Sequence, residues 1–599
     1  MNEHTRIEAA APPLSSQTGR RAAARRADHL APDCSNENFF AIDNSLQDLL
    51  SLYIPEATRV QITPHLSRLG ELAGGRLNDL ADLADKHPPI LHARDKYGRD
   101  EEWIEVHPAY REIQDIAFGQ FGLHAMTHRA GVLGHDAPHS ALTKQVFHYL
   151  FAQAEFGVLC PVNLTDSSSE LIRRYGSEAV KARFLDRMWT QDMERLLKGA
   201  QFMTEKIGGS DAGAAELVAV PEDGHWRLYG EKWFCSNVDA EVSVLLARPQ
   251  GAVAGGKGLG LFVMPKTLDD GTRNDYRILR LKDKLGSKSM PSGEIVFEGA
   301  LAWHLGDIDK GLKQMLEMVN SSRISHLARA AGMMRRCLNE ALAASGHRRA
   351  FGRTVSDFPL MRRQLMKMMV LTEQSLSALM FAATLYGDAT PEAKKLLRIT
   401  TPVVKYRACR DNVLVATAAM EARGGNGYIE DWPNARLVRD AHLGLIWEGT
   451  SSVNALDVVQ RAVAKERAHE ALRDDLADRL RKTPNIPGQF RTRIEGAVAQ
   501  ALDFAGEVAG SPEHERFSRV AAGGLYHAIT AVLLLTEGMA LGAAGGDSRR
   551  ALLARFVLEH RLTERSKYSL GGAWEPQAEA LLLGGSPVSA ETSLRLLLA

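Results

Sequence analysis

The stretch "HWRLYGEKWFCS", residues 225–236, has the clearest strand character in the chain. It is rich in aromatic residues, which favour strands, and it contains no proline. Further runs of this kind, separated by Gly, Pro, Asp and Asn, are "VSVLLAR", "GLGLFVM", "YRILRL" and "GEIVFEG". Residues 201–305 are therefore expected to form a compact antiparallel β domain.

Helical patterns lie on both sides of this β domain. Residues 38–200 are mainly helical, as in "NSLQDLLSLYI", and no strand run of note appears among them. After the β domain, the spacing of a buried helix face returns and predicts a helix to Gly346. Its first apolar positions are Leu312, Met315, Leu316 and Val319. Further helices are expected at 360–387, 391–421 and 452–481.

Two prolines in "RKTPNIPGQ", residues 481–489, interrupt the helical pattern and indicate a boundary. A C-terminal helical region is expected at 306–480 and a separate helical extension at 490–599. The predicted fold class is α+β, in the order N-terminal helical domain, middle β domain, C-terminal helical region and extension. Residues 1–37 mix Arg, Ala, Ser and Pro and are expected to be disordered.

Charge and cysteine content exclude several functional classes. The 599 residues carry 73 basic and 73 acidic side chains, so no global field attracts nucleic acid or an anionic membrane. Five scattered cysteines without a CxxC pair indicate free thiols in a reducing compartment, and we expect a cytoplasmic protein without a metal site. The longest apolar runs are too short to cross a bilayer, so no membrane span is expected.

Two motifs at the start of the β domain are candidates for binding. In "MTEKIGGSDAGA", residues 203–214, glycines allow backbone N–H groups to converge on an anion beside Ser210. An ordinary glycine-rich turn is the alternative. In "GEKWFCSN", Phe234 and Ser236 face the same side of a strand and suit a planar ring with a polar edge. An aromatic side chain packed in the core is the alternative there.

Two later motifs are candidates for phosphate binding. "GHRRAFGRTVSDFP", residues 346–359, carries Arg348, Arg349 and Arg353, and guanidinium groups bind phosphate in a bidentate manner. A solvated basic loop is the alternative. "ARGGNGYIEDWP", residues 422–433, is a second glycine-rich turn.

A single acid, Glu448, lies in "IWEGTSSV", residues 446–453. Ile446 and Trp447 are expected to shield the carboxylate partly from water, which favours its action as a base. Gly449 provides the turn that aims it. The alternative is purely structural, with Thr450 or Ser451 capping the following helix.

Taken together, these motifs resemble those of the acyl-CoA dehydrogenase flavoproteins. "MTEKIGGSD", "GEKWFCSN", "RRAFGR", "GGNGY" and "RDAHLGLIWEGTSSV" occur in that family's order, and the resemblance covers residues 130–465. "RLKDKLGSKS", "FGRTVSDFPLMRRQL", the tryptophan of "IWEGT" and the helical extension are similar to the AidB-type branch. The family fold is a helical domain, a middle β-barrel domain and a C-terminal four-helix bundle.

The resemblance implies a role for each matching position. Glu448 would be the catalytic base for an acyl-CoA thioester, with Arg323 nearby, and FAD would be the cofactor. Arg348 would reach the FAD of a neighbouring subunit, which implies a dimer or tetramer. An electron-transfer flavoprotein or similar acceptor would take the electrons. The cofactor-binding positions implied are Met203, Thr204, Gly209, Ser210, Phe234, Ser236, Arg348, Gly424, Gly425, Trp447, Thr450 and Ser452.

The same resemblance leaves a second function open, a flavoprotein that binds DNA or protects it from alkylation with weak dehydrogenase activity. Such a protein should carry a basic C-terminal region, because phosphate contacts supply most non-specific affinity. Residues 461–599 contain 18 Lys and Arg against 17 Asp and Glu, which is not a DNA-binding balance. The dehydrogenase is therefore the main expectation.

Overall fold

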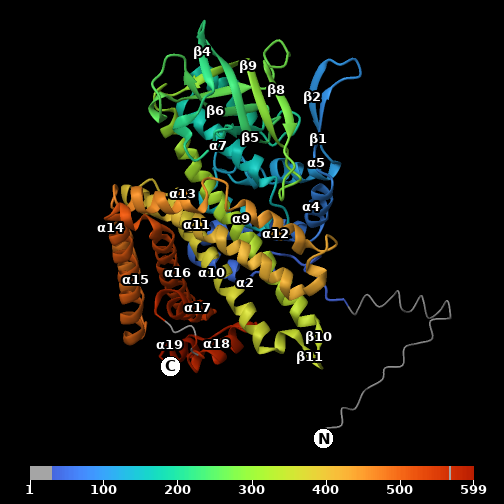
Figure 1. Ribbon diagram of the computed structural model, residues 1–599. Coiled ribbons are helices and arrows are strands. Elements are labelled where there is room, and N and C mark those ends of the chain that lie inside the picture. The colour runs from blue at the N-terminus through green and yellow to red at the C-terminus, as the bar shows by residue number, and fades with distance from the viewer. Residues whose placement is uncertain (1–29, 565–567, 569, 599) are drawn as a thin grey trace, which may run out of the picture.

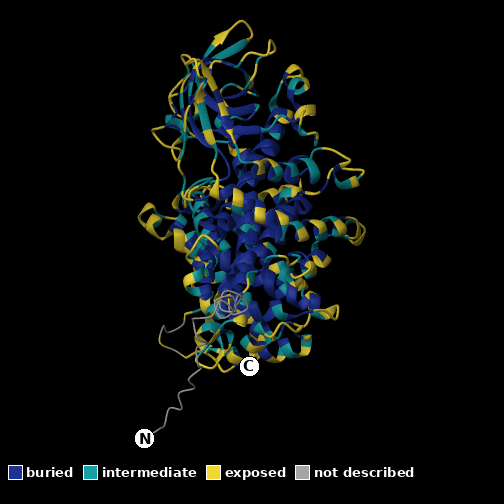
Figure 2. Ribbon diagram, turned by 90° about the vertical axis from the view of Figure 1, so that its right-hand side faces the viewer, coloured by how far each residue is buried: buried dark blue, intermediate teal, exposed yellow. Residues whose placement is uncertain are grey.

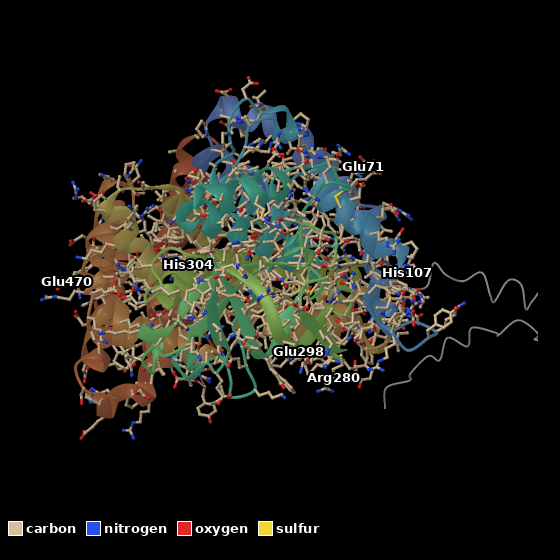
Figure 3. All side chains as sticks on the ribbon, turned by 90° about the horizontal axis from the view of Figure 1, so that it is seen from above. Glu71, His107, Arg280, Glu298, His304 and Glu470 are labelled. Carbon is tan, nitrogen blue, oxygen red and sulfur yellow. The ribbon has the colours of Figure 1, made fainter. Side chains whose placement is uncertain are left out.

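The structure is a computed structural model that describes residues 30–564, 568 and 570–598. The β domain lies at one end of a long helical body, and the last helices of the chain lie at the other end (Figure 1). Seen from above, Glu298 and His304 mark the β domain, while Glu71 and Glu470 lie on opposite flanks (Figure 3). Helices from both ends of the sequence therefore share one body beneath the β domain.

The N-terminal region is helical apart from one hairpin. Its helices are α2 (Asn44–Tyr53), α3 (Glu56–Gly74), α4 (Arg76–Lys86), α5 (Pro108–Gln114), α6 (Ala141–Ala152), α7 (Leu159–Tyr175) and α8 (Glu178–Met188), with short segments η2 (Asp115–Gln120) and η3 (Val132–Gly134). The hairpin consists of β1 (Ile90–Arg94) and β2 (Asp100–Glu105).

This hairpin corrects the expectation that residues 38–200 contain no strand. Its stability depends on contacts with the β domain, which the local pattern does not reveal. The buried Glu102 carboxylate accepts a hydrogen bond from the backbone N–H of Ile278 (2.9 Å) and forms an ion pair with Arg273 (3.1 Å). A two-stranded hairpin is marginal alone and needs such packing.

The start of the described chain is also better ordered than expected. The disorder prediction for residues 1–29 lies outside the described residues, and it is wrong for 30–37. Arg423 donates to the carbonyl oxygens of Ala31 and Pro32 (both 3.1 Å), and the buried Cys34 donates its backbone N–H to Glu340 (3.1 Å). Arg423 and Glu340 also form a buried ion pair with each other. This pair therefore holds a segment whose composition is typical of a disordered tail.

The middle domain is a closed β barrel. Its strands are β3 (Gly199–Phe202), β4 (Val218–Glu222), β5 (His225–Ser236), β6 (Val242–Pro249), β7 (Gly260–Pro265), β8 (Tyr276–Leu281) and β9 (Ser292–Leu305), with the short turns η4 (Ala212–Ala214) and η5 (Gly256–Gly258). The order is β3-β6-β4-β5-β9-β7, β8 adds to β9, and the β6–β7 pairing closes the ring.

Two pairings in the barrel are parallel, β3 with β6 and β4 with β6, so the expectation of a purely antiparallel domain is wrong there. A parallel pair needs a crossover connection. The antiparallel hairpin of β4 and β5 lies between β3 and β6 in the chain and provides it for that pair. The sequence predicted the strands, but it did not predict the parallel pairing of β3 and β4 with β6.

The C-terminal helical region begins with the longest helix of the protein's described part, α9 (Gly311–His347). The other elements are β10 (Arg349–Ala350), β11 (Arg353–Thr354), η6 (Val355–Asp357), α10 (Pro359–Gly387), α11 (Pro391–Arg423), η7 (Gly424–Gly427), α12 (Pro433–Leu443) and α13 (Ser451–Leu456). Helices α6, α9, α10 and α11 pack together in the centre of the body, where most residues are buried (Figure 2).

The prediction of a single helix at 452–481 is wrong. Helix α13 ends at Leu456, a π-helical segment η8 (Asp457–Val463) follows, and α14 (Ala468–Lys482) begins after Arg467. Arg467 has a left-handed backbone (φ 50°), which interrupts any right-handed helix. Apolar spacing does not report such a residue, because arginine carries no turn signal.

The extension packs against the central helices. Its elements are α15 (Gly488–Ala509), η9 (Pro512–Phe517), α16 (Ser518–Ala543), α17 (Arg549–Val557), η10 (Leu558–Leu562), α18 (Trp574–Leu583) and α19 (Ala590–Leu598). Two segments, Pro359–Gly387 and Pro512–Ala543, are long and apolar enough to cross a membrane by composition, but 94% and 83% of their most apolar windows are buried in the protein. Packing in the core explains their apolar character.

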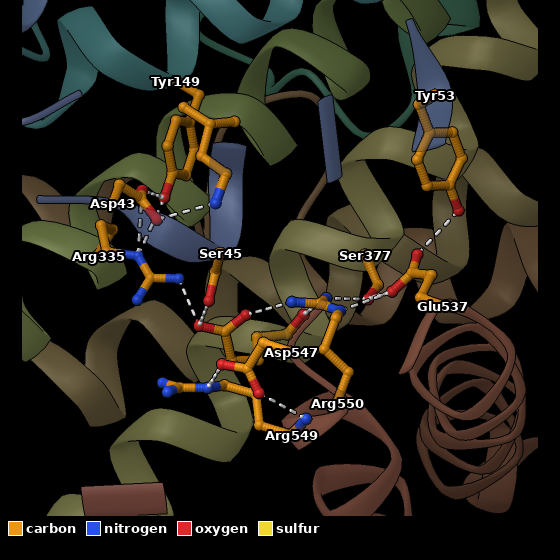
Figure 4. A network of polar contacts seen from close by, with 12 residues as sticks. Asp43, Ser45, Tyr53, Tyr149, Arg335, Ser377, Glu537, Asp547, Arg549 and Arg550 are labelled. Atoms are coloured by element: carbon orange, nitrogen blue, oxygen red, sulfur yellow. Dashed lines mark hydrogen bonds and ion pairs between the residues drawn. The ribbon is translucent and has the colours of Figure 1, made fainter. Parts of the chain in front are cut away.

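Buried ion pairs join the extension to the rest of the body (Figure 4). Arg550 of α17 binds Glu373 of α10 (2.6 Å) and Glu537 of α16 (2.9 Å), and all three side chains are buried. Glu373 also pairs with Arg335 of α9. Burial opposes the ionisation of Glu373, yet Arg335 and Arg550 lower its pKa to about 2.

Replacing Arg550 tests this network. Arg550→Ala leaves Glu373 and Glu537 short of a buried cation, and we expect it to lower the free energy of unfolding by about 3–5 kcal/mol. Urea denaturation followed by circular dichroism measures the loss. Arg76→Ala, which removes an exposed ion pair with Glu112, is the matched control and should cost at most about 1 kcal/mol. Equal losses in the two variants would contradict the interpretation.

Candidate active site

Glu448 lies in the loop between α12 and α13, and its backbone is left-handed (φ 54°). This conformation costs a residue other than glycine roughly 1–2 kcal/mol. Gly449 follows with φ 88°. Together the two residues reverse the chain and direct the Glu448 carboxylate toward α9. Strain of this kind occurs where the surroundings hold a side chain in a functional position.

Hydrogen bonds from two central helices and α13 hold this turn. The Ser322 hydroxyl on α9 donates to Oε1 of Glu448 (2.8 Å). Lys405 of α11 and Asn454 of α13 both donate to the Gly449 carbonyl oxygen (2.7 Å each). The carboxylate and the backbone that carries it are therefore fixed separately.

Arg323 fixes the same turn from the next position on α9. Its Nε donates to the Glu448 carbonyl oxygen (3.3 Å), and its Nη1 forms an ion pair with Asp457 (2.7 Å). Asp457 also binds Arg398 (2.8 Å). Burial opposes the ionisation of Asp457, but the two guanidinium groups outweigh it and lower its pKa. Arg323 thus contacts the backbone of Glu448, and its ion pair is with Asp457.

Trp447 forms the apolar side of the site. Its ring meets His326 edge-on (centroids 5.4 Å apart) and lies 6.3 Å from the Phe156 ring and 5.7 Å from the Arg329 guanidinium. Ile446 was expected to shield Glu448 as well, but it is 63% exposed, because the turn directs it outward. Trp447 therefore supplies the shielding, and Glu448 is half-buried.

Cys160, near the start of α7, connects the Glu448 turn with the β domain. Its thiol hydrogen-bonds with the Ser236 hydroxyl, and Glu448 acts on it electrostatically. Burial raises the pKa of Cys160 to about 11, so it is a neutral thiol. Ser236 of the β domain therefore contacts Cys160, and the charge of Glu448 acts on the same thiol.

Strand β5 presents Phe234 and Ser236 away from the barrel core. Cys235 between them is fully buried, whereas Phe234 is 56% exposed and Ser236 is half-buried. The alternative that Phe234 packs in the core is therefore wrong. An exposed aromatic ring beside a hydroxyl is available to a planar ligand.

A cavity of about 580 Å³ lies beside this strand. It is lined by residues including Lys282, Lys284 and Ser292, and Ser292 is the register partner of Ser236. Burial lowers the pKa of Lys284 to about 8, with Cys160 acting in the opposite direction. The cavity therefore reaches the strand positions that carry Ser236.

The glycine-rich loop adjoins Phe234. Its predicted binding residues differ in exposure: Met203 and Thr204 are half-buried, and Gly209 and Ser210 are exposed. The loop is anchored by Glu205, which forms a buried ion pair with Lys232 (2.6 Å) and accepts the backbone N–H of Glu216 (2.5 Å). The sequence interpretation missed this pair, because a charge in a strand reads as a solvated side chain.

The residues after Glu448 have structural partners. Thr450 caps α13 by accepting the backbone N–H of Val453 (3.4 Å), so the capping alternative is correct for this residue. Ser452 accepts a hydrogen bond from Arg519 of α16 (2.9 Å). The extension thus contacts the loop that carries the candidate base.

Arg348, Gly424 and Gly425 lie together, but far from Glu448. Arg348 donates to the Ala422 carbonyl oxygen (2.7 Å), and a Cβ at Gly424 would lie 3.2 Å from its guanidinium. Arg348 follows the C-terminal end of α9, 25 residues after Arg323. That spacing corresponds to about 37 Å along a helix axis. One chain alone does not bring these residues to Glu448.

Several residues of the site escaped the sequence interpretation. The missed contacts come from Cys160, Ser322 acting as a hydrogen-bond donor, Lys405, Asn454 and Asp457. One usable signal was Lys405, a lone cation in the stretch "TTPVVKY", residues 400–406, of a long helix. The others are common polar residues with no motif around them.

Comparison with known proteins agrees with this geometry. Family models match residues 30–195 (adaptive response protein AidB, N-terminal domain), 200–300 (acyl-CoA dehydrogenase, middle domain) and 309–463 (acyl-CoA dehydrogenase, C-terminal domain). The chain belongs to the acyl-CoA dehydrogenase family. It is similar to the AidB-type branch, and members of the family are FAD flavoproteins.

Individual relatives cover most of the chain. Acyl-CoA dehydrogenase family member 11 of Caenorhabditis elegans is 33% identical over 72% of this chain and 71% of its own. AidB of Escherichia coli is 33% identical over 64% of this chain and 70% of its own. The crystal structure of C. elegans ACDH-11 in complex with C11-CoA has a TM-score of 0.83 at 26% identity, covering 96% of this chain and 99% of that chain.

The residues present fit FAD. The exposed Phe234 ring and the Ser236 hydroxyl offer a surface to the flavin ring system, and the loop at Gly209 and Ser210 is open to solvent. A Cβ added at Gly208 would meet nothing within 4 Å, so this turn leaves room for a ligand. The acyl-CoA dehydrogenase family assignment and the local chemistry therefore agree.

Two substitutions at Glu448 separate backbone strain from side-chain chemistry. Both Glu448→Gly and Glu448→Ala remove the carboxylate, but only glycine relieves the left-handed backbone. We expect the glycine variant to be more stable than the alanine variant by about 1 kcal/mol. Urea denaturation of the two proteins measures the difference. An alanine variant of equal or greater stability would show that the turn is not strained.

Proposed function

We propose that the protein dehydrogenates an acyl-CoA thioester between its α- and β-carbons. The observation that carries the proposal is the Glu448 carboxylate, which a strained turn and the Ser322 hydroxyl hold beside Trp447. In this role Glu448 removes the α-proton as a general base. When bound, FAD supplies the acceptor for the hydride that leaves the β-carbon.

The surrounding residues orient the base and limit the access of water. Ser322 fixes one carboxylate oxygen, and Arg323 holds the carbonyl group of the same residue. Trp447, His326 and Phe156 form an apolar side that disfavours hydration of the reacting atoms. These positions supply the orientation and water exclusion that a proton abstraction next to a thioester requires.

A relative supports the substrate class. The structure of C. elegans ACDH-11 was solved with C11-CoA, and we extend binding of an acyl-CoA to this chain on that basis. The family resemblance implies an electron-transfer flavoprotein as the acceptor. We propose an electron-transfer flavoprotein or a similar protein as the electron acceptor. We also propose a cytoplasmic location, because all five cysteines are free thiols.

Replacement of the base tests the proposed reaction. Glu448→Gln keeps the shape of the side chain but removes its basicity, and we expect it to slow flavin bleaching by acyl-CoA about 10²–10⁴-fold. FAD content, measured from the visible spectrum, should remain that of the wild type. Stopped-flow absorbance with a panel of thioesters measures the rate.

A wild-type protein that contains FAD but is bleached by no thioester would contradict the proposal. Binding of a DNA duplex by that protein in a mobility-shift assay would then favour the DNA-binding alternative. An unchanged rate in Glu448→Gln would instead assign proton abstraction to another residue.

We also propose that Arg348 serves the FAD of a neighbouring subunit, so that the active unit is at least a dimer. The support is the roughly 37 Å of helix α9 between Arg323 and the Arg348 end. The paired Gly424 turn lies at that same end. A guanidinium placed there reaches a pyrophosphate only if a second chain presents one.

Mixed oligomers distinguish this arrangement from a site within one chain. Arg348→Ala and Glu448→Gln should each be inactive alone, because each lacks one essential part. When the two are refolded together, a hybrid site takes Glu448 from one chain and Arg348 from the other, and we expect activity to return. Arg363→Ala, at an exposed position on α10, is the control and should stay active. No recovery in verified hybrids would contradict the shared site.

A further inference from the structure

Arg329 on α9 is a buried cation without an acid partner. It is 1% exposed, and its Nε donates to the Ser325 carbonyl oxygen one turn earlier (3.3 Å). Among the described residues, its Nη1 has no hydrogen-bond acceptor and no carboxylate lies within 4 Å of its guanidinium. A buried charge normally has a partner, because desolvation is costly.

The other buried arginines of α9 follow that rule. Arg323 pairs with Asp457, Arg335 with Glu373, and Arg336 with Glu340 (2.8 Å). Each of these pairs lies within the body of the protein. Arg329 is therefore the exception among the buried arginines of its own helix. It does not belong to the ion pairs that the other arginines form.

Aromatic rings compensate the Arg329 charge only in part. The guanidinium lies 5.3 Å from the centroid of Phe156 and 5.7 Å from that of Trp447. Such contacts stabilise a cation less than a carboxylate does. Burial lowers the pKa of Arg329, with Cys160 and Glu448 acting in the opposite direction, but a guanidinium remains protonated in proteins.

Arg329 lies close to the proposed base. It is seven residues, or about two helical turns, after Ser322, which binds the Glu448 carboxylate. That separation is about 10 Å along the axis. The Trp447 ring, next to Glu448 in the chain, contacts the guanidinium. The Arg329 guanidinium therefore lies on the helix that holds the base and contacts the residue next to it in the chain.

Buried neutral polar groups without partners lie near the same position. Both ring nitrogens of the fully buried His148, the Ser325 hydroxyl and Nε2 of His326 have no hydrogen-bond partner among the described residues. Burial lowers the pKa of His148 to about 3, with Lys144 acting in the same direction, so its ring is neutral. Unpaired buried polar groups are rare, and here they gather around one cation.

We propose that Arg329 binds a carboxylate at the far end of the acyl chain, so that the preferred substrate is an ω-carboxyacyl-CoA. The proposal rests on the acyl-CoA dehydrogenase function argued above. A bidentate pair with Arg329 would supply the missing partner, and the neutral groups nearby would add hydrogen bonds. An unbranched hydrocarbon chain would leave all of them unpaired.

Matched thioesters that differ only at the far end test this specificity. Holoenzyme carrying Glu448→Gln, in which the reaction is slowed, is titrated by calorimetry with glutaryl-CoA against pentanoyl-CoA, and adipyl-CoA against hexanoyl-CoA. We expect the dicarboxylic thioester of at least one pair to bind about tenfold or more tightly. Arg329→Met in the same background should abolish that preference, and Arg329→Lys should retain part of it.

Stability measurements separate a binding residue from a structural one. Because Arg329 has no partner to lose, Arg329→Met should leave the thermal midpoint of the unliganded protein unchanged or higher. Arg336→Met, which breaks a buried ion pair, is the control and should lower the midpoint without changing the chain-end preference.

Equal binding of both members of each pair by the parent protein would overturn the proposal, as would a preference that survives Arg329→Met. If Arg329→Met does not fold, the parent ratios and Arg329→Lys still decide the question. Failure of every thioester to bleach wild-type flavin is a separate outcome. It would contradict the dehydrogenase function even where the binding preference is found.

Discussion

The left-handed backbone at Glu448 is the constraint on which the site depends. A glutamate held at φ 54° is unfavourable alone, so the turn exists because several partners hold it. Arg323 binds its carbonyl group, and Lys405 and Asn454 bind the next one. These partners come from different helices. The direction of one carboxylate therefore depends on the packing of the whole helical body.

Helix α9 connects the features that the proposed function needs. Ser322 and Arg323 near its start hold the Glu448 turn, Arg329 lies two turns further, and Arg335 pairs with Glu373. Arg348 follows its C-terminal end. A rigid helix of this length separates the predicted catalytic residue Arg323 from the predicted cofactor contact Arg348. The same rigidity that positions the base is the support for the proposal of a site shared between subunits.

Sequence patterns were informative where a short motif carried the chemistry. The strand runs of residues 201–305 indicated the β domain, and the turn at Glu448 indicated the base, because residue type and spacing are local properties. The hairpin of β1 and β2, the break at Arg467 and the order of residues 30–37 were missed. The hairpin and residues 30–37 depend on partners far away in the chain, such as Ile278 for the hairpin, whereas the break at Arg467 is a local backbone conformation that arginine does not signal.

The sequence by itself determined the fold class, the family and the identity of the candidate base. The order of the motifs and the period of the hydrophobic residues can be read from the sequence without any knowledge of tertiary contacts. Only the tertiary structure decided that Ile446 is exposed, that Cys160 links Ser236 with the Glu448 turn, and that Arg329 is buried without an acid. The physical reason is that burial and charge pairing are properties of residues brought together from distant segments, and no local pattern records which partner is missing.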